Sequence, residues 1–494
     1  MEILSEQKLW QLYRSPRMPR FGKRALLHEI NRRSAQAGLR HARRRDDSEN
    51  ESTTFPNGWH ANFTDLWLVE VFTPLDFPAL ARDLEDLNKQ TRGFSAFNDY
   101  AEWISKARQQ NGIAWTAIPT FASPDCRRLL PDKITEELPQ GVEVVTGSIS
   151  TVSSGISVLV MNFEYRDDFS SQLNELVNRR YSAQLGRRRG GAYEMLGIDQ
   201  QKSEAIAKWR EERAQEASAW VKTHFSGFFA REASLSLPVI ELFQTTGFIP
   251  WDETTPRGVE SRSLRTLGLS YDFGSYWKSE DFPSLRARHK DGWFKKGTAS
   301  PDVLVLAANE RDLVGGSSLP PGDTLHHVRW LVSQLAIRWA LSCLVVRSGR
   351  RFNRVRDDVT QAVEKASFGD FIELRDELLQ TGVDSNLTVM EAIKFADSRN
   401  WDWELPTFAH FVPPGLNANP VDLDELWKSE QLAEARRITE AEQHLREVAS
   451  TAAELTNAAY NIRLQGRVFF LTIASLLVSL VALWVSYVSL KQGG

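Results

Sequence analysis

The sequence is poor in cysteine, and its two cysteines, Cys126 and Cys343, lie far apart. A disulfide framework needs several paired cysteines and a zinc site needs closely spaced ones, so the sequence predicts neither. A reducing compartment is therefore the expected setting. The first twenty residues also lack the apolar core of a secretion signal, and we expect the body of the protein to stay in the cytoplasm.

Motifs that would identify a reaction are missing from the sequence. The segment "GWFKKGT" at 292–298 comes closest to a phosphate-binding loop, but it lacks the lysine that follows the second glycine. No HExxH zinc motif and no GxSxG nucleophile motif occurs. We therefore expect no cofactor and no metal. Whether the protein is an enzyme stays open, with a non-enzymatic role favoured.

An excess of one charge sign is also missing. The formal net charge is −4 over 494 residues, so no global field singles out a partner. Charged residues make up 25% of the chain and hydrophobic residues 42%, as in ordinary globular proteins. The length is enough for two or three domains.

One long uncharged run is present, from Val468 to Leu490. A helix of that length reaches roughly 34 Å, against about 30 Å for the hydrocarbon core of a bilayer. Arg467 and Lys491 flank the run, and Trp484 and Tyr487 lie near its far end, where aromatic rings favour the interface. The run predicts one C-terminal transmembrane helix at 468–490.

A second apolar stretch, at 325–346, contains Arg329 and Arg338, and we expect it to be a buried helix of the soluble body. The chain therefore spans the membrane once, as a tail-anchored protein with its N-terminal body in the cytoplasm. A weak excess of basic residues on the body side of the span agrees with this orientation. Arginine greatly outnumbers lysine, which is typical of GC-rich genomes and favours a bacterial inner membrane.

Hydroxyl-bearing residues recur along the predicted span at spacings of three and four. A helix places such positions on one face. Small residues let membrane helices approach each other, so this stripe predicts a helix–helix packing face or, in a larger ring, a pore lining. The alternative is that each hydroxyl bonds the carbonyl four residues earlier and faces lipid. The stripe consists of Thr472, Ser475, Ser479, Ala482, Ser486 and Ser489.

Apolar residues repeat every seven positions in the segment before the span. They fill the a and d positions of four heptads, and no Gly or Pro interrupts 421–465. The pattern predicts a long coiled-coil-like stalk helix at 421–467 that self-associates and continues into the span. Three of the eight seam residues are alanine, which makes a thin seam, so packing against the body of the same chain is the alternative. The seam consists of Ile438, Ala441, Leu445, Val448, Ala452, Leu455, Ala459 and Ile462.

The remaining chain predicts an α+β soluble region, with a mostly antiparallel sheet and helices, followed by a helical region. We expect a basic N-terminal arm and linker at 1–58, an α+β domain at 59–195, a helical connector at 196–232 and a mixed, mainly helical domain at 233–415. The segment "SLRTLGLSYDF" at 263–273 predicts a strand. Whether the last domain continues the first stays open.

Arginine clusters are a further feature, and residues 1–45 alone hold twelve Lys or Arg against three Glu. Guanidinium groups bind phosphates and stack on bases, and anionic lipid headgroups attract the same residues. The alternatives are a solvated surface and contact with an anionic lipid, a nucleotide or a nucleic acid. The candidate anion contacts are Arg187, Arg188, Arg189, Arg350, Arg351 and Arg354.

The layout of soluble body, stalk and single span resembles two known arrangements. One is the magnesium-channel family with a cytoplasmic α/β funnel and long stalk helices, which has two spans and a Gly-Met-Asn signature. This sequence has one such span and lacks the tripeptide, so the resemblance covers the layout alone. The other is the loose class of bacterial defence proteins in which a sensor domain controls a membrane-permeabilising helix.

We predict a membrane protein with a cytoplasmic sensor or interaction body that forms a homo-oligomer through stalk and span. The most specific form of this prediction is a membrane-perturbing or channel-like effector. The alternative is a membrane-tethered enzyme or a passive adaptor whose site is not visible in the sequence. A pocket with clustered carboxylates or perturbed pKa values in the body would favour the enzyme.

Overall fold

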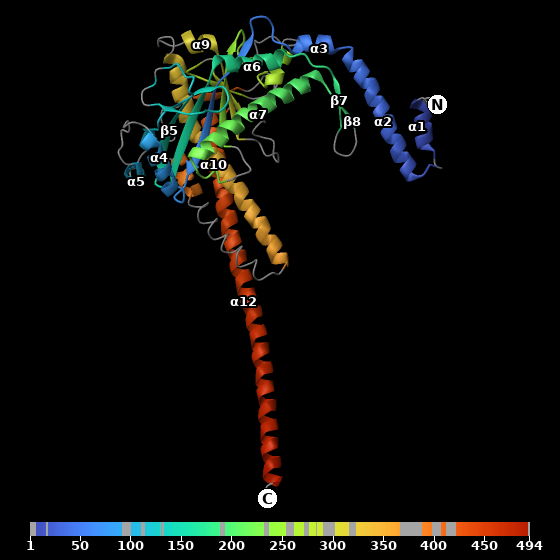
Figure 1. The fold of residues 1–494 in the computed structure, drawn as a ribbon, viewed down its shortest axis with the longest axis vertical. Coiled ribbons are helices and arrows are strands. Elements are labelled where there is room, and N and C mark those ends of the chain that lie inside the picture. Colours follow the sequence, from blue (N-terminus) through green and yellow to red (C-terminus); the bar gives the residue numbers. More distant parts are fainter. Residues whose placement is uncertain are drawn as a thin grey trace. The chain divides into compact units, whose positions relative to one another are not determined.

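The fold comes from a computed structural model, shown in Figure 1. The chain divides into two compact units, Met1–Leu344 with Lys394–Glu430, and Val345–Ile393 with Gln431–Gly494. The structure describes residues 6–15, 18–90, 100–109, 114–128, 130, 133–187, 193–231, 237–252, 261–270, 276–282, 284–289, 302–315, 323–365, 388–397, 407–411 and 421–492.

One sheet of eleven strands forms the centre of the first unit. In order across the sheet the strands are β13 (Phe408–Phe411), β10 (Tyr276–Ser279), β11 (Arg286–His289), β12 (Val303–Asn309), β9 (Val239–Thr246), β1 (His60–Phe72), β6 (Ile156–Tyr165), β5 (Val142–Ser153), β3 (Phe121–Ala122) and β4 (Ile134–Thr135), with β2 (Ala114–Ala117) also paired to β5. Two of these pairs, β9 with β12 and β3 with β4, are parallel, and the others are antiparallel. The predicted combination of a sheet with helices is confirmed, and the sheet is one large mixed sheet. Strands from 59–195 and from 233–415 share this one sheet.

The central strands are buried on both faces. All ten residues of β6 are buried, and so are the last eight of β1. Strands of this kind need helices on both sides of the sheet. The segments "VEVVTGSIS" and "GISVLVMNFEY" alternate around a Ser/Gly turn, which predicts a hairpin. β5 and β6 form this hairpin, through a turn at 154–155.

A β-bulge in β1 decides which side chains reach which face of the sheet. The pairing of β1 with β9 shifts register between Phe63 and Asp65. The Phe63 ring lies 5.4 Å from the Trp209 ring of α7 (Ile198–His224), measured between centroids. Asp65 instead pairs with Arg329 of α10 (Asp323–Lys365). Residues two apart on a regular strand share a face, so the extra residue at the bulge produces the switch.

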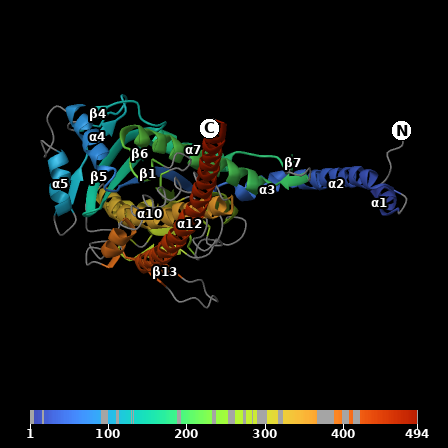
Figure 2. The same cartoon turned by 90° about the horizontal axis from the view of Figure 1, so that it is seen from below.

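Two helical layers cover the sheet of the first unit (Figure 2). α6 (Asp167–Asn178) and α7 lie on one face, with α8 (Ser261–Leu267) packed beside them, and the part of α10 up to Leu344 lies on the other. The remaining described elements of this unit are α1 (Glu6–Arg14), α2 (Arg20–Arg43), α4 (Phe77–Gln90), α5 (Tyr100–Gln109), β7 (Gln184–Arg187), β8 (Tyr193–Leu196) and α9 (Glu310–Gly315).

The first part of the segment predicted as a linker, 48–58, is helical, because it belongs to α3 (Asp46–Thr53). The Asn50 side chain donates to the Tyr181 carbonyl at 2.8 Å and accepts from the Tyr181 amide at 2.9 Å. Lys202 of α7 donates to the Thr53 carbonyl at 3.2 Å. The polar residues that made this segment resemble a linker are therefore bonded to the backbone of neighbouring elements, which holds the helix on the body.

A helix also occupies the start of the strand predicted at 263–273. α8 ends in a Schellman motif, in which Gly268 has a φ of +76° and the Leu269 amide donates to the Leu264 carbonyl at 2.9 Å. Leu264 and Leu267, three positions apart, are both buried. An apolar segment this short fits the helical and the strand period, so periodicity alone does not separate them. The end of the predicted strand lies outside the described residues.

The apolar stretch with two internal arginines is a buried helix, as predicted. It belongs to α10, and 89% of an apolar 18-residue window within Thr324–Arg354 is buried inside the protein. Arg329 pairs with Asp65, and Arg338 pairs with Asp424 at 2.9 Å. Arg338 is buried and Arg329 is partly buried, and each has a partner of opposite sign, which is the condition for burying a charge in a helix.

The second unit contains the end of α10 and most of α12 (Leu423–Gln492). The two helices approach closely at Gly349, where an added Cβ atom would lie 2.5 Å from Glu434 Oε1 and 3.5 Å from Ile438. Ile438, the first seam residue, is 3% exposed. The start of the predicted seam therefore packs within the chain. α12 runs as one helix through the predicted stalk and span.

His289 on β11 is enclosed by aromatic side chains of the first unit. Its ring centroid lies 5.0 Å from that of Trp339, and the Trp427 indole donates to His289 Nε2 at 3.3 Å. Burial lowers the pKa of His289 from 6.5 to about 3. The imidazole is therefore neutral in the folded protein at physiological pH.

We predict that His289 makes folding stability fall on acidification. Its folded pKa lies below its unfolded one, so its stabilisation is complete above pH 6.5. The stabilisation is lost as the pH falls from 6.5 toward 3, at about 1.4 kcal/mol per pH unit. His289→Gln removes this titration and keeps an acceptor for Trp427. Urea unfolding, followed by tryptophan fluorescence above and below pH 6.5, measures the slope.

The exposed His60 provides the control, because His60→Gln also removes one histidine. The wild type and His60→Gln should lose stability on acidification more steeply than His289→Gln. Equal slopes in all three proteins would contradict a buried, neutral His289.

Candidate functional site

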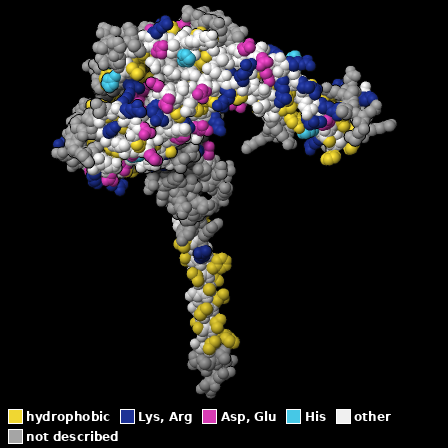
Figure 3. Space-filling view, turned by 45° about the horizontal axis from the view of Figure 1, so that its top comes forward, with side chains coloured by type: hydrophobic (Ala, Val, Ile, Leu, Met, Phe, Trp, Pro, Cys, Tyr) yellow, Lys and Arg dark blue, Asp and Glu magenta, His cyan; other side chains and the backbone are white. Residues whose placement is uncertain are grey.

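The C-terminal part of α12 is the candidate membrane segment. Leu464–Ser486 is long and apolar enough to cross a bilayer, and none of it is buried inside the protein. The other helix of this kind, Thr324–Arg354, is mostly buried. Figure 3 shows hydrophobic side chains along the described part of the C-terminal helix. Among the described residues, this exposed segment overlaps the span predicted at 468–490.

The hydroxyl groups of the stripe bond their own helix. Each of three hydroxyls donates to the carbonyl four residues earlier, which is the arrangement of a stripe that faces lipid. The residues remain small, so a second helix can still approach this face. The side chain of Ser489 lies outside the described ones. The bonds join Thr472 to Val468 at 2.8 Å, Ser479 to Ser475 at 2.9 Å and Ser486 to Ala482 at 2.9 Å.

The stalk seam is described at its two ends. Ile438 packs beside Gly349, and Ala441 is half-buried, whereas Ile462 is 70% exposed. Self-association through the later heptads stays a prediction. The side chains outside the described part are those of Leu445, Val448, Ala452, Leu455 and Ala459.

The arginines predicted as anion contacts belong to separate elements. Arg350, Arg351 and Arg354 lie on α10, where positions 350 and 354 share a face. Arg187 is the last residue of β7. Their role as anion contacts stays a prediction. Outside the described residues lie Arg188 and Arg189.

Two carboxylates occupy neighbouring strands on the face that α10 covers. Asp65 of β1 and Glu164 of β6 are cross-strand partners, and they are 0% and 8% exposed. Arg329 bridges them, with Nε 2.8 Å from Asp65 Oδ1 and Nη1 2.8 Å from Glu164 Oε2. Arg128 adds a contact to Glu164 at 2.7 Å. Burial raises the pKa of Asp65, and the Arg329 charge opposes that shift.

A cavity of about 400 Å³ opens beside this cluster, between the sheet and α10. Glu164, Arg329 and Asn162 line it, together with Trp115, which is 54% exposed. Asn162 donates its amide to Asp65 at 3.2 Å, but its Oδ1 is buried and has no hydrogen-bond partner among the described residues. A ligand that carries a donor group would satisfy this oxygen. The cavity is therefore a candidate site for a small polar ligand.

Sequence reasoning did not find this cluster. Asp65 and Glu164 each interrupt an apolar strand, and Arg329 interrupts an apolar helix. A charge inside an apolar run is a usable signal, because it needs a partner when it is buried. Only the pairing of the strands brings the three residues together.

No family model matches the chain, and neither a curated protein nor a solved structure matches it. The function must therefore be inferred from the geometry of the sites. Among the described residues, no group of three or more His, Cys, Asp or Glu side chains is placed to hold a metal ion.

We predict that Arg329 stabilises the body by neutralising both carboxylates. Arg329→Met leaves Asp65 and Glu164 without their shared cation, which should lower the free energy of unfolding by about 3–5 kcal/mol. Adding Asp65→Asn should recover part of the lost stability, because only one of the two negative charges then remains. Urea unfolding of the detergent-solubilised protein, followed by tryptophan fluorescence, measures both effects.

Arg311→Met is the matched control, because it removes an exposed arginine of α9. It should change the unfolding free energy by less than about 0.5 kcal/mol. An Arg329→Met protein as stable as Arg311→Met would show that the carboxylates do not need this cation.

Proposed function

We propose that this protein is a single-pass membrane protein whose α/β body is held at the bilayer by its C-terminal helix. The observation that carries the proposal is the exposure of Leu464–Ser486, where the large apolar side chains are 40–73% exposed. An apolar surface of this extent is typical of a lipid or protein contact. The length of the segment matches a hydrocarbon core, which favours lipid.

A cytoplasmic body in a bacterial inner membrane is the second part of the proposal. Cys126 and Cys343 are buried and form no disulfide with each other, which suits a reducing compartment. Arg463 and Arg467 precede the span, and Lys491 follows it. The basic excess favours placing the body on the cytoplasmic side.

Self-association in the membrane is the third part of the proposal. The seam begins in contact with α10, so association rests on its later heptads, where Ile462 is 70% exposed. In the span, the stripe of small residues lets a second helix approach. A pair of such helices would pack, and a larger ring would line a pore. The body would then act as a sensor that controls a membrane-perturbing helix.

A membrane-tethered enzyme is the second candidate function, favoured by the cavity beside the paired carboxylates. Carboxylates beside a cavity are suited to acid–base chemistry, and His326 also lines this cavity. Arg329 pairs with Asp65 and Glu164, and Arg128 pairs with Glu164. A bound molecule would meet carboxylates that are already neutralised. Ligand sensing therefore fits the cavity better than catalysis.

Removal of residues 466–494 should release the protein to the soluble fraction, because it removes most of the exposed apolar helix. The full chain should sediment with membranes and resist extraction by high salt. Leu477→Arg combined with Val481→Arg keeps the length of the chain and should also release it. Two charges near the centre of a span cost roughly 5–7 kcal/mol together. Ultracentrifugation of cell membranes followed by immunoblotting measures the distribution.

The shortened protein must show the tryptophan fluorescence of a folded body for this comparison. If it is folded and still sediments with membranes, another element is the anchor and the proposal fails.

The stripe is tested by combining Ser475→Leu, Ser479→Leu and Ser486→Leu, which keeps the span apolar and fills its small-residue face. Crosslinking between chains in membranes should fall by about threefold or more, because close packing and any hydroxyl contacts across helices are lost. Ion flux from loaded vesicles should fall with it if the helices line a pore.

The matched control combines Ile473→Leu, Val481→Leu and Val485→Leu, which changes other faces of the same helix. Control and wild type should crosslink equally. Wild-type crosslinking in the Ser triple variant would leave the span as an anchor without a packing face.

A further inference from the structure

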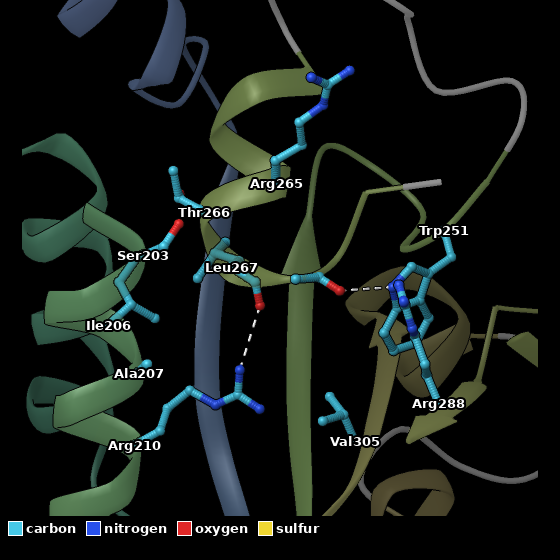
Figure 4. Close-up of a pocket in the computed structure, with 11 residues that line it drawn as sticks. Ser203, Ile206, Ala207, Arg210, Trp251, Arg265, Thr266, Leu267, Arg288 and Val305 are labelled. Atoms are coloured by element: carbon cyan, nitrogen blue, oxygen red, sulfur yellow. Dashed lines mark hydrogen bonds between the residues drawn. The ribbon is translucent and has the colours of Figure 1, made fainter. Parts of the chain in front are cut away.

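A second cavity, of about 280 Å³, lies on the opposite face of the sheet from the carboxylate cluster. α7, the end of α8 and strands β11 and β12 surround it. Figure 4 shows Arg210 entering from α7 on one side, with Arg288 and Trp251 on the other. The cavity thus brings together side chains from five parts of the chain, none of which the sequence motifs single out.

The floor of this cavity is a row of paired strand positions. Arg288 of β11 pairs with Val305 of β12, and Val305 pairs with Glu241 of β9. Paired residues on neighbouring strands share a face, and neighbouring strands lie about 4.8 Å apart. The Cα atoms of Arg288 and Glu241, two strands apart, are therefore about 10 Å from each other. Arg210 reaches down from α7 and forms a buried ion pair with Glu241. Its guanidinium and that of Arg288 therefore flank the same space.

The guanidinium of Arg210 is held rigidly. It is bound to Glu241 and donates to the Leu267 carbonyl at 3.5 Å. Arg210 is 6% exposed, and its Nε has no hydrogen-bond partner among the described residues. An acceptor inside the cavity would satisfy this donor.

The lining is basic and partly apolar. Its described lining residues include the guanidinium groups of Arg210, Arg265 and Arg288 and no carboxylate. The Arg288 guanidinium is poorly solvated, and this burial lowers its pKa to about 10. Ile206 and Val305 supply apolar walls, and both are buried. A ligand for such a cavity carries a negative group at one end and an apolar group beside it.

Trp251 forms the aromatic wall in a strained conformation. Its φ is +49°, in the left-handed region that bulky residues rarely adopt. Its amide donates to the Leu269 carbonyl at 3.0 Å, and its indole donates to the Gly268 carbonyl at 2.9 Å. Both bonds lead to the C-terminal end of α8. Strain that is maintained by such bonds is frequent at binding sites.

We propose that this cavity binds the phosphate group of a phosphate monoester, held between Arg210 and Arg288, with the ester group against Trp251 and the apolar wall. A guanidinium binds phosphate oxygens in bidentate fashion, and charged hydrogen bonds of this kind are about twice as strong as neutral ones. A phosphate monoester carries a charge of about −1.5 to −2 at neutral pH. Its three acceptor oxygens can meet the Nε donor of Arg210 and the guanidinium of Arg288 at the same time.

The mouth of the cavity is open to such a ligand. Ala207 and Arg265 line it and are both exposed. Arg265 therefore stands where an incoming anion would first meet positive charge. This inference is independent of membrane anchoring, and it supplies the ligand class that the proposed sensor body would detect.

Isothermal titration of the full chain, in phosphatidylcholine nanodiscs, with phenyl phosphate tests the proposal. Phenyl sulfate is the matched probe, with the same shape and a single negative charge. Saturable binding of phenyl phosphate is expected, and phenyl sulfate should bind about tenfold more weakly.

Substitutions at Arg288 identify the site, because this side chain lies on the cavity floor. Arg288→Met should weaken phenyl phosphate binding by about 10-fold to 100-fold, since it removes a charged pair of hydrogen bonds. Arg288→Lys keeps the charge without the fork of donors and should bind with intermediate affinity. Arg311→Met changes the net charge equally, away from the cavity, and should bind as the wild type does.

The series Arg, Lys, Met also separates binding from folding, because a variant counts only if its unfolding midpoint is that of the wild type. Arg288→Lys remains as the test if Arg288→Met does not fold. Equal affinity in the wild type and the folded Arg288 variants overturns the proposal, as does a lack of saturable binding of phenyl phosphate at millimolar concentration.

A final arm identifies the source of the phosphate. Nanodiscs that contain phosphatidic acid should block phenyl phosphate binding if the natural ligand is a lipid headgroup, and should leave it unchanged if the ligand is soluble. Either result upholds the phosphate site, provided that the Arg288 variants respond as stated. Binding is measured apart from sedimentation, so failure of the anchor and failure of this site are distinguishable.

Discussion

The two ion pairs of Arg329 are the interaction on which the arrangement of the body depends. β1 and β6 lie at the centre of the sheet, and each carries a carboxylate on the face that α10 covers. Like charges on paired strand positions repel each other, and this repulsion grows when water is excluded. The helix that shields them from water therefore brings the cation that they require. Sheet pairing and helix docking are coupled at this point, because the paired carboxylates need the cation that the helix carries.

The bulge at 63–65 gives the sheet two chemically different faces. Before it, Phe63 faces the aromatic side chains of α7, and after it Asp65 faces α10. The carboxylate cavity consequently opens on the α10 face, and the arginine cavity opens on the α7 face. A regular strand would place Phe63 and Asp65 on the same face. One extra residue thus allows a single sheet to support two candidate binding sites of different charge.

Burial distinguishes the two long apolar helices, which pass the same test of length and composition. The part of α10 up to Leu344 carries Arg329 and Arg338, each with an acidic partner, and packs on the sheet. The single charge in Leu464–Ser486, Arg467, is exposed, and no element covers this segment among the described residues. A helix that exposes apolar side chains on every side needs an apolar environment, and a bilayer provides one. This difference supports membrane anchoring more strongly than hydropathy alone.

The sequence by itself determined the local elements. The hairpin of β5 and β6, the buried helix with Arg329 and Arg338, and the apolar C-terminal helix all follow from periodicity and run length. It did not determine that α3 is helical, because Asn50 bonds to Tyr181, which is far away in the sequence. Nor did it reveal either cavity, since Asp65 meets Glu164, and Arg288 approaches Arg210, only after strands far apart in sequence pair. Periodicity reports interactions within a few residues, whereas the tertiary structure alone decides which buried charges become partners.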